Sequence, residues 1–369
     1  MPLFMDRHDM SVPVTPEMIA TIHQEDVKIQ NQLGCRVLTY WFDEKRNNTF
    51  CLIEAPNAEA IHKMHALAHG QVPNTVIEVG ADLVEAFLGR VTDPEKPADA
   101  AMNIIAESAF RTIMIVSFKQ EIQPAEASKK IRESFQKFQA DTLHLLAKHR
   151  GKLVKQNESC MMVSFESSSN AVHAAFSIKS RFSEFRDDIK NDNITLKIGL
   201  SAGVPVTGNN SFFESTIKLA ERMCKIIKGD IIVSAGVKEL YNNENMEVLK
   251  EEDSLLCMTE MEEKFLTSLM DFAETNWHNT DLNLDDFSKA LGYSKSQLYR
   301  KMTSLTGKSP NTFIQDYRLN EALTLLNKNA GNISEIAYQT GFSSPSYFSK
   351  CFKKKYGVMP YEFKDAATR

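Results

Sequence analysis

The sequence predicts a multidomain α+β fold, in which two α+β sandwich domains precede an all-α domain. At about 100–200 residues per domain, a chain of 369 residues is expected to form two or three domains. Two polar segments without a helical apolar stripe, Thr92–Ala101 and Asn242–Ser254, are typical of linkers. Strand and helix patterns alternate before the second linker, and only helical periods follow it. We therefore predict domains over residues 1–92, 108–245 and 260–369.

The composition excludes several classes of protein. Hydrophobic residues make up 43% and charged residues 25%, which is typical of globular proteins and excludes disordered or collagen-like chains. No apolar run approaches the length of a membrane span, and the N-terminus lacks the pattern of a secretory signal. The six cysteines are scattered without a CxxC pair, as expected for reduced thiols. We expect a cytoplasmic protein without a membrane partner.

The first segment predicts a ferredoxin-like domain. Apolar residues at 18, 19, 22, 29 and 33 fit one side of a helix over Glu17–Leu33. Cys35–Phe42 and Thr49–Ile53 flank the polar turn DEKRNN and predict a hairpin. A second helix is expected over Ala58–Ala68, and a last strand over Asn74–Val79. With an opening strand, these elements follow the βαββαβ order of the ferredoxin-like fold.

The second segment predicts another α+β sandwich domain. Arg111–Phe118 is a short apolar strand, and Ala125–His149 carries the apolar stripe of a long helix. Lys152–Lys155 and Cys160–Phe165 are expected to form a hairpin across a polar turn.

The third segment repeats itself and predicts a tandem helix-turn-helix. Leu282–Pro310 aligns with Gly331–Pro360 at an offset of 49 up to the turn glycine and of 50 after it. Each unit has a short helix, a Gly-aromatic turn and a second helix, with turns expected at Gly292, Gly307, Gly341 and Gly357. A helix around Thr312–Asn327 joins the units. From residue 281 onward, 13 Lys and Arg face eight Asp and Glu, so this segment carries +5 in a chain of −5. This charge distribution favours an anionic partner such as double-stranded DNA.

The second helix of each unit supplies the candidate DNA contacts. Leu298, Met302 and Leu305 share one face and are expected in the core, as are Phe348 and Phe352 in the second unit. The remaining faces offer hydroxyls and cations for base edges and phosphates. The candidates are Ser296, Gln297, Tyr299, Arg300, Lys301, Ser346, Ser349, Lys350 and Lys353. The alternative is a solvated helix pair with ordinary surface lysines.

This segment resembles the DNA-binding domain of the AraC/XylS family of bacterial transcription regulators. The resemblance covers about Leu266–Lys364 and rests on LGYSKSQLYRKMTSLTGKSPNTFIQDYRL and EIAYQTGFSSPSYFSKCFKKKYGVMPYEF. It implies two recognition helices that enter successive major grooves, and RNA polymerase as a candidate further partner.

The middle segment resembles the class III adenylate/guanylate cyclase domain over about Phe110–Tyr241. The resemblance rests on GKLVKQNESCMMVSFESSSNAVHAAFSIKSRF and LKIGLSAGVPVTGNNSFFESTIKLAERMCKIIKGDIIVSAGV. In that family two aspartates hold the catalytic metal ions. Here Ser117 takes the place of the first, and Glu158-Ser159-Cys160 replaces the Gly-Asp-Gly turn of the second.

Because a hydroxyl is a poor substitute for a carboxylate ligand, we expect a degenerate, cyclase-like domain without enzymatic activity. The resemblance implies that this domain forms a homodimer. Lys155, Lys218 and Arg222 are candidate residues for a nucleotide or anion.

The first segment contains five of the nine histidines, which makes it a candidate metal-binding domain. On a helix, His62, His65 and His69 fall within about 60° of one another. His23 and Asp26 lie one turn apart on the first predicted helix. Imidazole is a ligand for nickel, zinc, copper and iron. The predicted ligands are His23, Asp26, Tyr40, Cys51, Glu54, His62, His65 and His69. The alternative is that these are ordinary surface histidines.

The same segment is similar to a small bacterial family that has a nickel-binding member and a dimeric αβ-barrel fold. The similarity rests on MPLFMDRHDM and GCRVLTYWFDEKRNNTFCLIEAPNAEAIHKMHALAHGQVPNTVIEV. It makes His23, His65 and Glu54 the first choices as ligands. It also makes nickel the first choice of metal, followed by zinc or iron.

Together these features predict a DNA-binding transcription regulator that is controlled by a metal ion or small ligand in its N-terminal domain. The cyclase-like domain would dimerise or transmit the signal. The competing hypothesis is a nucleotidyl cyclase with unorthodox metal ligands fused to a DNA-binding domain. A pure metal store is disfavoured, because it would leave the DNA-binding domain without a purpose.

Overall fold

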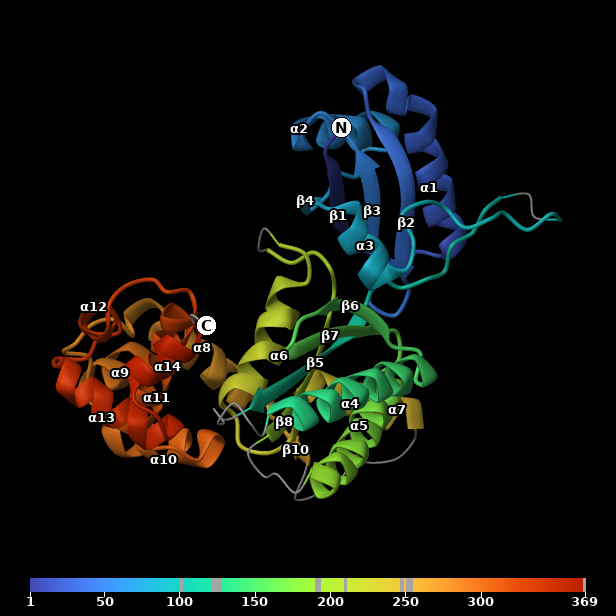
Figure 1. Cartoon of the computed structure of the whole chain (residues 1–369). Coiled ribbons are helices and arrows are strands. Elements are labelled where there is room, and N and C mark those ends of the chain that lie inside the picture. Colours follow the sequence, from blue (N-terminus) through green and yellow to red (C-terminus); the bar gives the residue numbers. More distant parts are fainter. Residues whose placement is uncertain are drawn as a thin grey trace.

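A computed structural model describes residues 1–99, 102–120, 128–189, 194–208, 211–245, 249 and 255–367. Two sheet-containing α+β regions precede a helical region, which confirms the predicted fold class (Figure 1). Among the described residues, no helix combines the length and apolarity that crossing a bilayer requires.

The N-terminal region has the ferredoxin-like arrangement. Its four antiparallel strands follow the order β2-β3-β1-β4. Side chains alternate along β1, so that Phe4 faces α1 and α2 while Met5 faces α3. The elements are β1 (Leu3–Asp9), α1 (Pro16–Ile29), the 3-10 turn η1 (Gln30–Leu33), β2 (Arg36–Asp43), β3 (Asn48–Glu54), α2 (Ala58–Ala68), β4 (Thr75–Val79) and α3 (Ala81–Leu88).

The middle region repeats this strand order and extends it. Strands β6, β7, β5 and β8 follow the same order as β2, β3, β1 and β4, and two short parallel strands continue the sheet beyond β8. The elements are β5 (Arg111–Gln120), α4 (Ser128–Lys148), β6 (Lys152–Gln156), β7 (Cys160–Phe165), α5 (Ser168–Ile189), β8 (Ile194–Gly203), α6 (Glu214–Ile226), β9 (Ile231–Val233), α7 (Ala235–Asn245) and β10 (Leu255–Cys257).

Two predicted segments of the middle region lie partly outside the described residues. The second predicted linker, Asn242–Ser254, begins inside α7, so its first four residues are helical. Residues 246–248 and 250–254 of that linker lie outside the described part of the chain, as do residues 125–127 of the predicted long helix.

Helix α3 was not predicted, and it is shared by the two sheets. Phe87 is fully buried and packs on Phe213 and Phe212, with ring centroids 4.9 and 5.6 Å apart. The same apolar cluster contains residues of β1 and β3 on one side and of β5 on the other. Arg111, buried at the start of β5, donates hydrogen bonds to the carbonyls of Phe87 (3.1 Å) and Leu88 (3.3 Å). The N-terminal and middle regions therefore share one continuous core.

The helical region contains the two predicted helix-turn-helix units. All four predicted turn glycines have positive φ, between 71° and 78°, which confirms those turns. The elements are α8 (Glu260–Asn276), α9 (Leu284–Leu291), α10 (Lys295–Thr306), α11 (Pro310–Asn327), α12 (Ile333–Gln339), α13 (Pro345–Tyr356) and α14 (Pro360–Ala367).

The two units have separate cores. The core of the first unit, with Phe287 and Leu298, is continuous with Met223 and Ile227 of the middle region. Among the described residues, the core of the second unit, around Phe348, is formed by α11 to α14 and the turns between them. Helix α11 bridges both, because its N-terminal half packs in the first core and its C-terminal half in the second.

The equivalent turn glycines differ in their surroundings, which gives a paired prediction. A Cβ on Gly341 would lie 2.8 Å from the carbonyl oxygen of Trp277, whereas a Cβ on Gly292 would meet nothing within 4 Å. Both residues have a left-handed backbone, which costs a non-glycine residue about 1 kcal/mol or more. We expect Gly341→Ala to lower the thermal unfolding temperature clearly more than its control Gly292→Ala. Equal shifts would contradict the close approach.

Candidate metal centre and nucleic-acid interface

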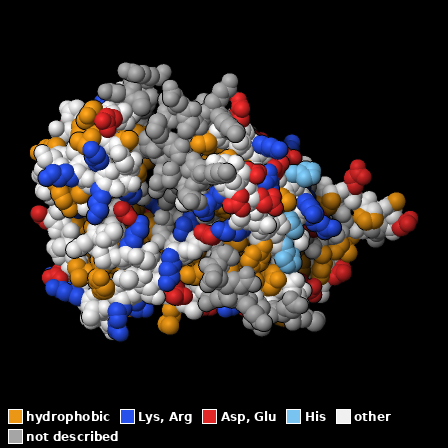
Figure 2. Space-filling model, turned by 60° about the horizontal axis from the view of Figure 1, so that its bottom comes forward, with side chains coloured by type: hydrophobic (Ala, Val, Ile, Leu, Met, Phe, Trp, Pro, Cys, Tyr) orange, Lys and Arg blue, Asp and Glu red, His pale blue; other side chains and the backbone are white. Residues whose placement is uncertain are grey.

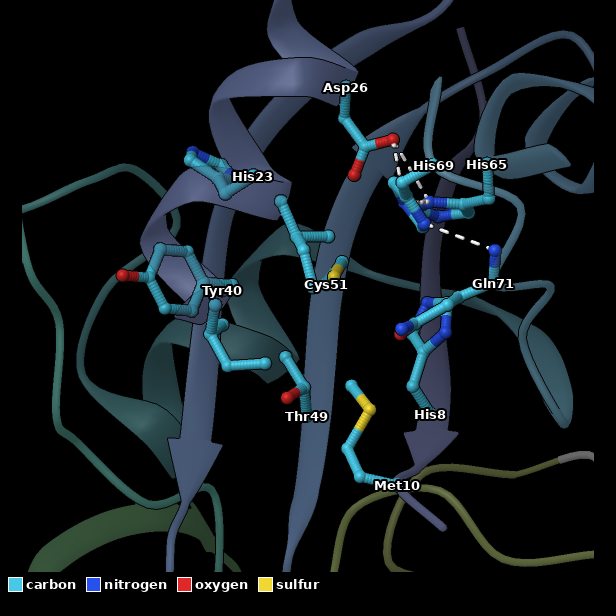
Figure 3. A pocket seen from close by; sticks show the side chains of 12 residues that line it. His8, Met10, His23, Asp26, Tyr40, Thr49, Cys51, His65, His69 and Gln71 are labelled. Carbon is cyan, nitrogen blue, oxygen red and sulfur yellow. Dashed lines mark hydrogen bonds and ion pairs between the residues drawn. The ribbon is translucent and has the colours of Figure 1, made fainter. Parts of the chain in front are cut away.

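A small cavity of about 10 Å³ lies between α1, α2 and the face of the N-terminal sheet that these helices cover (Figure 3). That volume holds one water-sized species, so it suits a single ion rather than an organic ligand. The lining residues are His8, Met10, Ile19, Ile22, His23, Asp26, Tyr40, Thr49, Cys51, His65, His69 and Gln71.

Three donor atoms converge beside this cavity. Asp26 Oδ1 lies 3.1 Å from His65 Nδ1 and 3.2 Å from His69 Nε2, and the two ring nitrogens lie 3.1 Å apart. In a tetrahedral or octahedral site with bonds of about 2.1 Å, adjacent ligand atoms lie about 3.0–3.4 Å apart. The triangle formed by Asp26, His65 and His69 therefore has the dimensions of a ligand set.

One atom of this triangle lacks the hydrogen bond that burial demands. Asp26 Oδ1 is buried and close to both rings, yet it accepts no hydrogen bond of good geometry from a described residue. Its contacts with the two rings are ion pairs without good hydrogen-bond geometry, so a cation in the triangle would satisfy this buried oxygen better. His69 Nδ1 accepts a hydrogen bond from the backbone N–H of Gln71 (3.2 Å), so coordination through Nε2 requires that bond to be released.

Asp6 organises the centre from β1. Its Oδ2 lies 2.8 Å from His65 Nε2, and its Oδ1 accepts a hydrogen bond from the backbone N–H of Cys51 (3.0 Å). A carboxylate on the far nitrogen orients a metal-binding histidine and fixes its tautomer. Asp6, His8 and Cys51 also form a second group of closely spaced donor atoms.

The electrostatics of the centre favour a cation. Burial tends to lower the pKa of His65, but the carboxylates of Asp6 and Asp26 outweigh this and raise it to about 10. Burial tends to raise the pKa of Asp6, but His8 and His65 hold it well below its usual range. Burial and the charges of Asp6 and Asp26 raise the pKa of the Cys51 thiol well above its ordinary value. Two carboxylates thus meet in a buried space in which the protonated His65 ring supplies positive charge, and a metal ion bound there would have to displace a proton from that ring.

The structure brings six of the eight predicted ligands to the cavity and places two elsewhere. His23, Asp26, Tyr40, Cys51, His65 and His69 line it. Glu54 does not, because Cys51 and Ile53 face the helices and strand alternation turns the next side chain to the other side. Glu54 instead pairs with Arg36 at 3.2 Å. His62 lies one to two turns before His65 and His69 on α2 and is also outside the lining.

Two residues of the second group of donor atoms, Asp6 and His8, were not among the predicted ligands. They occupy alternate positions of β1 and are buried, with exposures of 1% and 5%. The signal was present in the sequence LFMDRHD, where an acid and a histidine two residues apart share one face of an apolar strand.

The first recognition helix, α10, has the predicted division between core and surface. Leu298, Met302 and Leu305 are buried. Ser296, Tyr299 and Arg300 are exposed. Two further candidates have local roles. Gln297 closes a capping box with Ser294 at the start of the helix, and the Lys301 ammonium lies 5.1 Å from the ring centroid of Tyr293.

The second recognition helix, α13, is similar. Phe348 and Phe352 are buried, whereas Ser346, Lys350 and Lys353 are exposed. Ser349 is half-buried, and its hydroxyl donates to the Pro345 carbonyl at 2.9 Å. Tyr347 was not predicted, yet it is 52% exposed, and its hydroxyl accepts a hydrogen bond from Gln315 Nε2 (2.9 Å). Figure 2 shows Lys and Arg side chains spread over the visible face of the helical region, at the left.

Substitutions on the recognition helices should separate base contacts from phosphate contacts. Arg300→Ala is expected to weaken binding to a selected DNA site by about 1–3 kcal/mol and to relax sequence preference, because arginine pairs with guanine through two hydrogen bonds. Lys353→Ala should weaken binding to all DNA sequences. It should also reduce the slope of the logarithm of the binding constant against the logarithm of the salt concentration by about one. Fluorescence anisotropy at several salt concentrations measures both effects. Lys264→Ala, on α8, is the control. If Arg300→Ala lowered the affinity equally for all DNA sequences, contact of Arg300 with a base would be contradicted.

The three candidate residues for a nucleotide or anion do not line one common cleft. Arg222 is 6% exposed and pairs with Asp271 (2.5 Å) and Glu274 (2.8 Å) of α8. Lys218 pairs with Glu214 at 2.5 Å, one turn earlier on α6. Lys155 is exposed on β6, outside the cleft that Lys218 and Arg222 line. That cleft also holds the acids Glu260, Glu263 and Asp271. The geometry therefore does not gather these residues into an anion site, and Arg222 instead joins the middle region to α8.

Two family models match parts of the chain. Residues 287–366 match a helix-turn-helix domain model, which covers both recognition helices and confirms the predicted DNA-binding domain. Residues 4–79 match the model of the nickel responsive protein SCO4226-like family, and this range contains both groups of donor atoms.

Individual relatives match in part. The "Histidine kinase P4" of Formosa agariphila is 24% identical over 98% of this chain and 27% of its own length. The "HTH-type transcriptional regulator MtrA" of Neisseria gonorrhoeae is 32% identical over 27% of this chain and 31% of its own length. The chain thus spans about a quarter to a third of the length of these relatives. The crystal structure of SCO4226 from Streptomyces coelicolor A3(2) is 28% identical, with a TM-score of 0.20, and the match covers 21% of this chain and 94% of that one. Residues 4–79 of this chain are therefore similar to the SCO4226-like family, and residues 287–366 are similar to a helix-turn-helix domain.

Proposed function

We propose that the protein is a sequence-specific DNA-binding transcription regulator that responds to a divalent transition metal in its N-terminal domain. The observation that carries the proposal is the combination of two exposed recognition helices with a buried group of histidines and carboxylates in one chain. The relative named as a transcriptional regulator supports the DNA-binding part of the proposal. The match to the nickel-responsive family supports the metal-binding part.

Asp26, His65 and His69 would hold the metal, with Asp6 orienting His65. Nitrogen and oxygen donors suit nickel, which we favour, and also zinc and iron. When bound, the ion supplies the positive charge that neutralises the buried carboxylates. To bind the ion, the His65 ring would release its Nδ1 proton to solvent, while the hydrogen bond to Asp6 would keep the other ring proton on Nε2.

The middle domain would carry the signal to the DNA-binding domain. Its core is continuous with α3 on one side and with the first helix-turn-helix unit on the other. The same proposal includes three domains, over residues 1–92, 108–245 and 260–369. It also includes a homodimer formed through the middle domain, and contact with RNA polymerase.

The test is DNA affinity with and without Ni²⁺ at fixed salt. Regulation requires that the metal-bound and metal-free forms differ in affinity, so we expect the two binding curves to separate for the wild type. They should coincide for His65→Ala. His62→Ala is the matched control, because His62 lies on the same helix outside the cavity, and it should behave as the wild type. Coincident wild-type curves would refute metal control.

The alternative, a nucleotidyl cyclase, has a direct test of its own. Ser117 and Glu158–Cys160 stand where the resemblance places the catalytic aspartates. We therefore expect no cyclic nucleotide from purified protein given ATP or GTP with Mn²⁺. Cyclic product would establish the alternative.

A further inference from the structure

The segment that joins the N-terminal and middle domains lies along the edge of the N-terminal sheet. We name its described residues, 91–99 and 102–109, the inter-domain strap. Its Asp93 N–H donates to the carbonyl of Leu38 (3.2 Å), and its Glu107 carbonyl accepts from the N–H of Phe42 (2.9 Å). Both partners lie on the edge strand β2. Ile105 of the strap is buried in the apolar cluster that surrounds the metal cavity.

Two strap residues touch side chains that line the cavity. Asp93 Oδ2 lies 3.2 Å from His23 Nε2, and the backbone N–H of Ile105 donates to the Tyr40 hydroxyl at 3.0 Å. His23 and Tyr40 are themselves in contact, with ring centroids 4.8 Å apart. Figure 3 shows them on the same side of the cavity, His23 from α1 and Tyr40 from β2. The strap therefore holds one wall of the candidate metal centre.

The Asp93 contact leaves His23 ready to act as a ligand. His23 is 9% exposed, and its other ring nitrogen, Nδ1, is buried with no hydrogen-bond partner in the described part of the chain. A neutral imidazole that donates from Nε2 to a carboxylate carries its lone pair on Nδ1, which is the metal-binding form. Asp6 makes the same contact with Nε2 of His65. Two histidines that line the cavity, His23 and His65, are thus each held at Nε2 by a carboxylate.

We propose that Asp93 is a positioning residue of the metal centre, which presents His23 as a further ligand and ties metal occupancy to the inter-domain strap. The inference rests on the proposed function, since it needs a metal in the N-terminal cavity. Asp93 lies beyond residues 4–79, so the family match does not include it. The strap leads directly into β5, whose first residue, Arg111, holds the end of α3. A metal that fixes His23 therefore steadies the connection to the middle domain.

The test compares full-length wild type with Asp93→Asn and with Glu95→Gln, a control at an exposed position of the same strap. An asparagine amide can donate to His23 Nε2 and so favours the tautomer with a proton on Nδ1. We expect Asp93→Asn to weaken Ni²⁺ binding about 10–100-fold in equilibrium dialysis. Hydrogen exchange should also show that saturating Ni²⁺ protects the amides of residues 102–109 in the wild type and in Glu95→Gln, but not in Asp93→Asn.

Asp93→Glu provides a rescue, because it keeps the carboxylate, and it should recover most of the affinity and the protection. Wild-type affinity and protection in Asp93→Asn would overturn the inference while leaving the metal centre intact. A wild type that binds no Ni²⁺, or a His65→Ala variant that binds it undiminished, would overturn the proposed centre instead.

Discussion

Phe87→Ala is expected to destabilise the N-terminal and middle domains together, by about 3–5 kcal/mol. Phe87 is fully buried in the apolar cluster that both sheets share, where it packs on Phe212 and Phe213. Its removal leaves a cavity between the sheets, and neither sheet can close it alone because each is held by its own hydrogen bonds. Differential scanning calorimetry should show one shared transition moving to lower temperature.

The control for this substitution is Leu83→Ala. Leu83 lies on the same helix, α3, but is 39% exposed, so its removal should change stability by no more than about 0.5 kcal/mol. A Phe87→Ala variant in which only the N-terminal transition moves would show that the two domains do not unfold as one unit.

The second large effect concerns the two recognition helices, whose core residues Leu298 and Phe348 are related by the offset of 50. Both are fully buried, and Leu→Ala or Phe→Ala at such sites costs about 2–5 kcal/mol. The consequences should differ, because the core of Leu298 continues into the middle domain whereas that of Phe348 does not. In hydrogen exchange, Phe348→Ala should increase the exchange rate of backbone amides in α12 to α14 alone. Leu298→Ala should also loosen α6.

Ser296→Ala and Ser346→Ala are the matched controls for this pair. Both serines are exposed, at equivalent positions of α10 and α13, so neither substitution should change exchange in the cores. Exchange confined to α8–α11 in Leu298→Ala would contradict a core shared with the middle domain.

This difference bears on regulation. The first helix-turn-helix unit is attached to the middle domain by a common core and by the ion pairs of Arg222 with α8. The second unit is attached through α11. If the middle domain carries the signal as proposed, its movement would change the position of the first recognition helix most directly. Coupling would arise if DNA fits only one relative placement of the two recognition helices.

The sequence alone was sufficient for features that depend on neighbouring residues. The helical periods and the repeat at an offset of 49 to 50 predicted both helix-turn-helix units, their turn glycines and their buried faces. One-turn spacing on two helices selected His23, Asp26, His65 and His69, which the fold brings to one cavity. Such groupings can be made from the sequence because residues three or four positions apart on a helix share a face whatever surrounds it, while the role of these four residues as metal ligands stays a prediction.

Only the tertiary structure decided what depends on contacts between distant segments. Glu54 lies outside the cavity, which the sequence could not show because the phase of a strand is not known until its partners are. The spacing of Asp6 and His8 on one face of a strand was visible in the sequence, but their burial depends on the elements that cover β1. Arg222 resembles an anion ligand in sequence but meets two carboxylates from a helix about fifty residues later. Asp93 reaches His23 across 70 residues. The residues that complete the centre and join the domains are brought together by packing between distant segments, and local sequence patterns do not determine that packing.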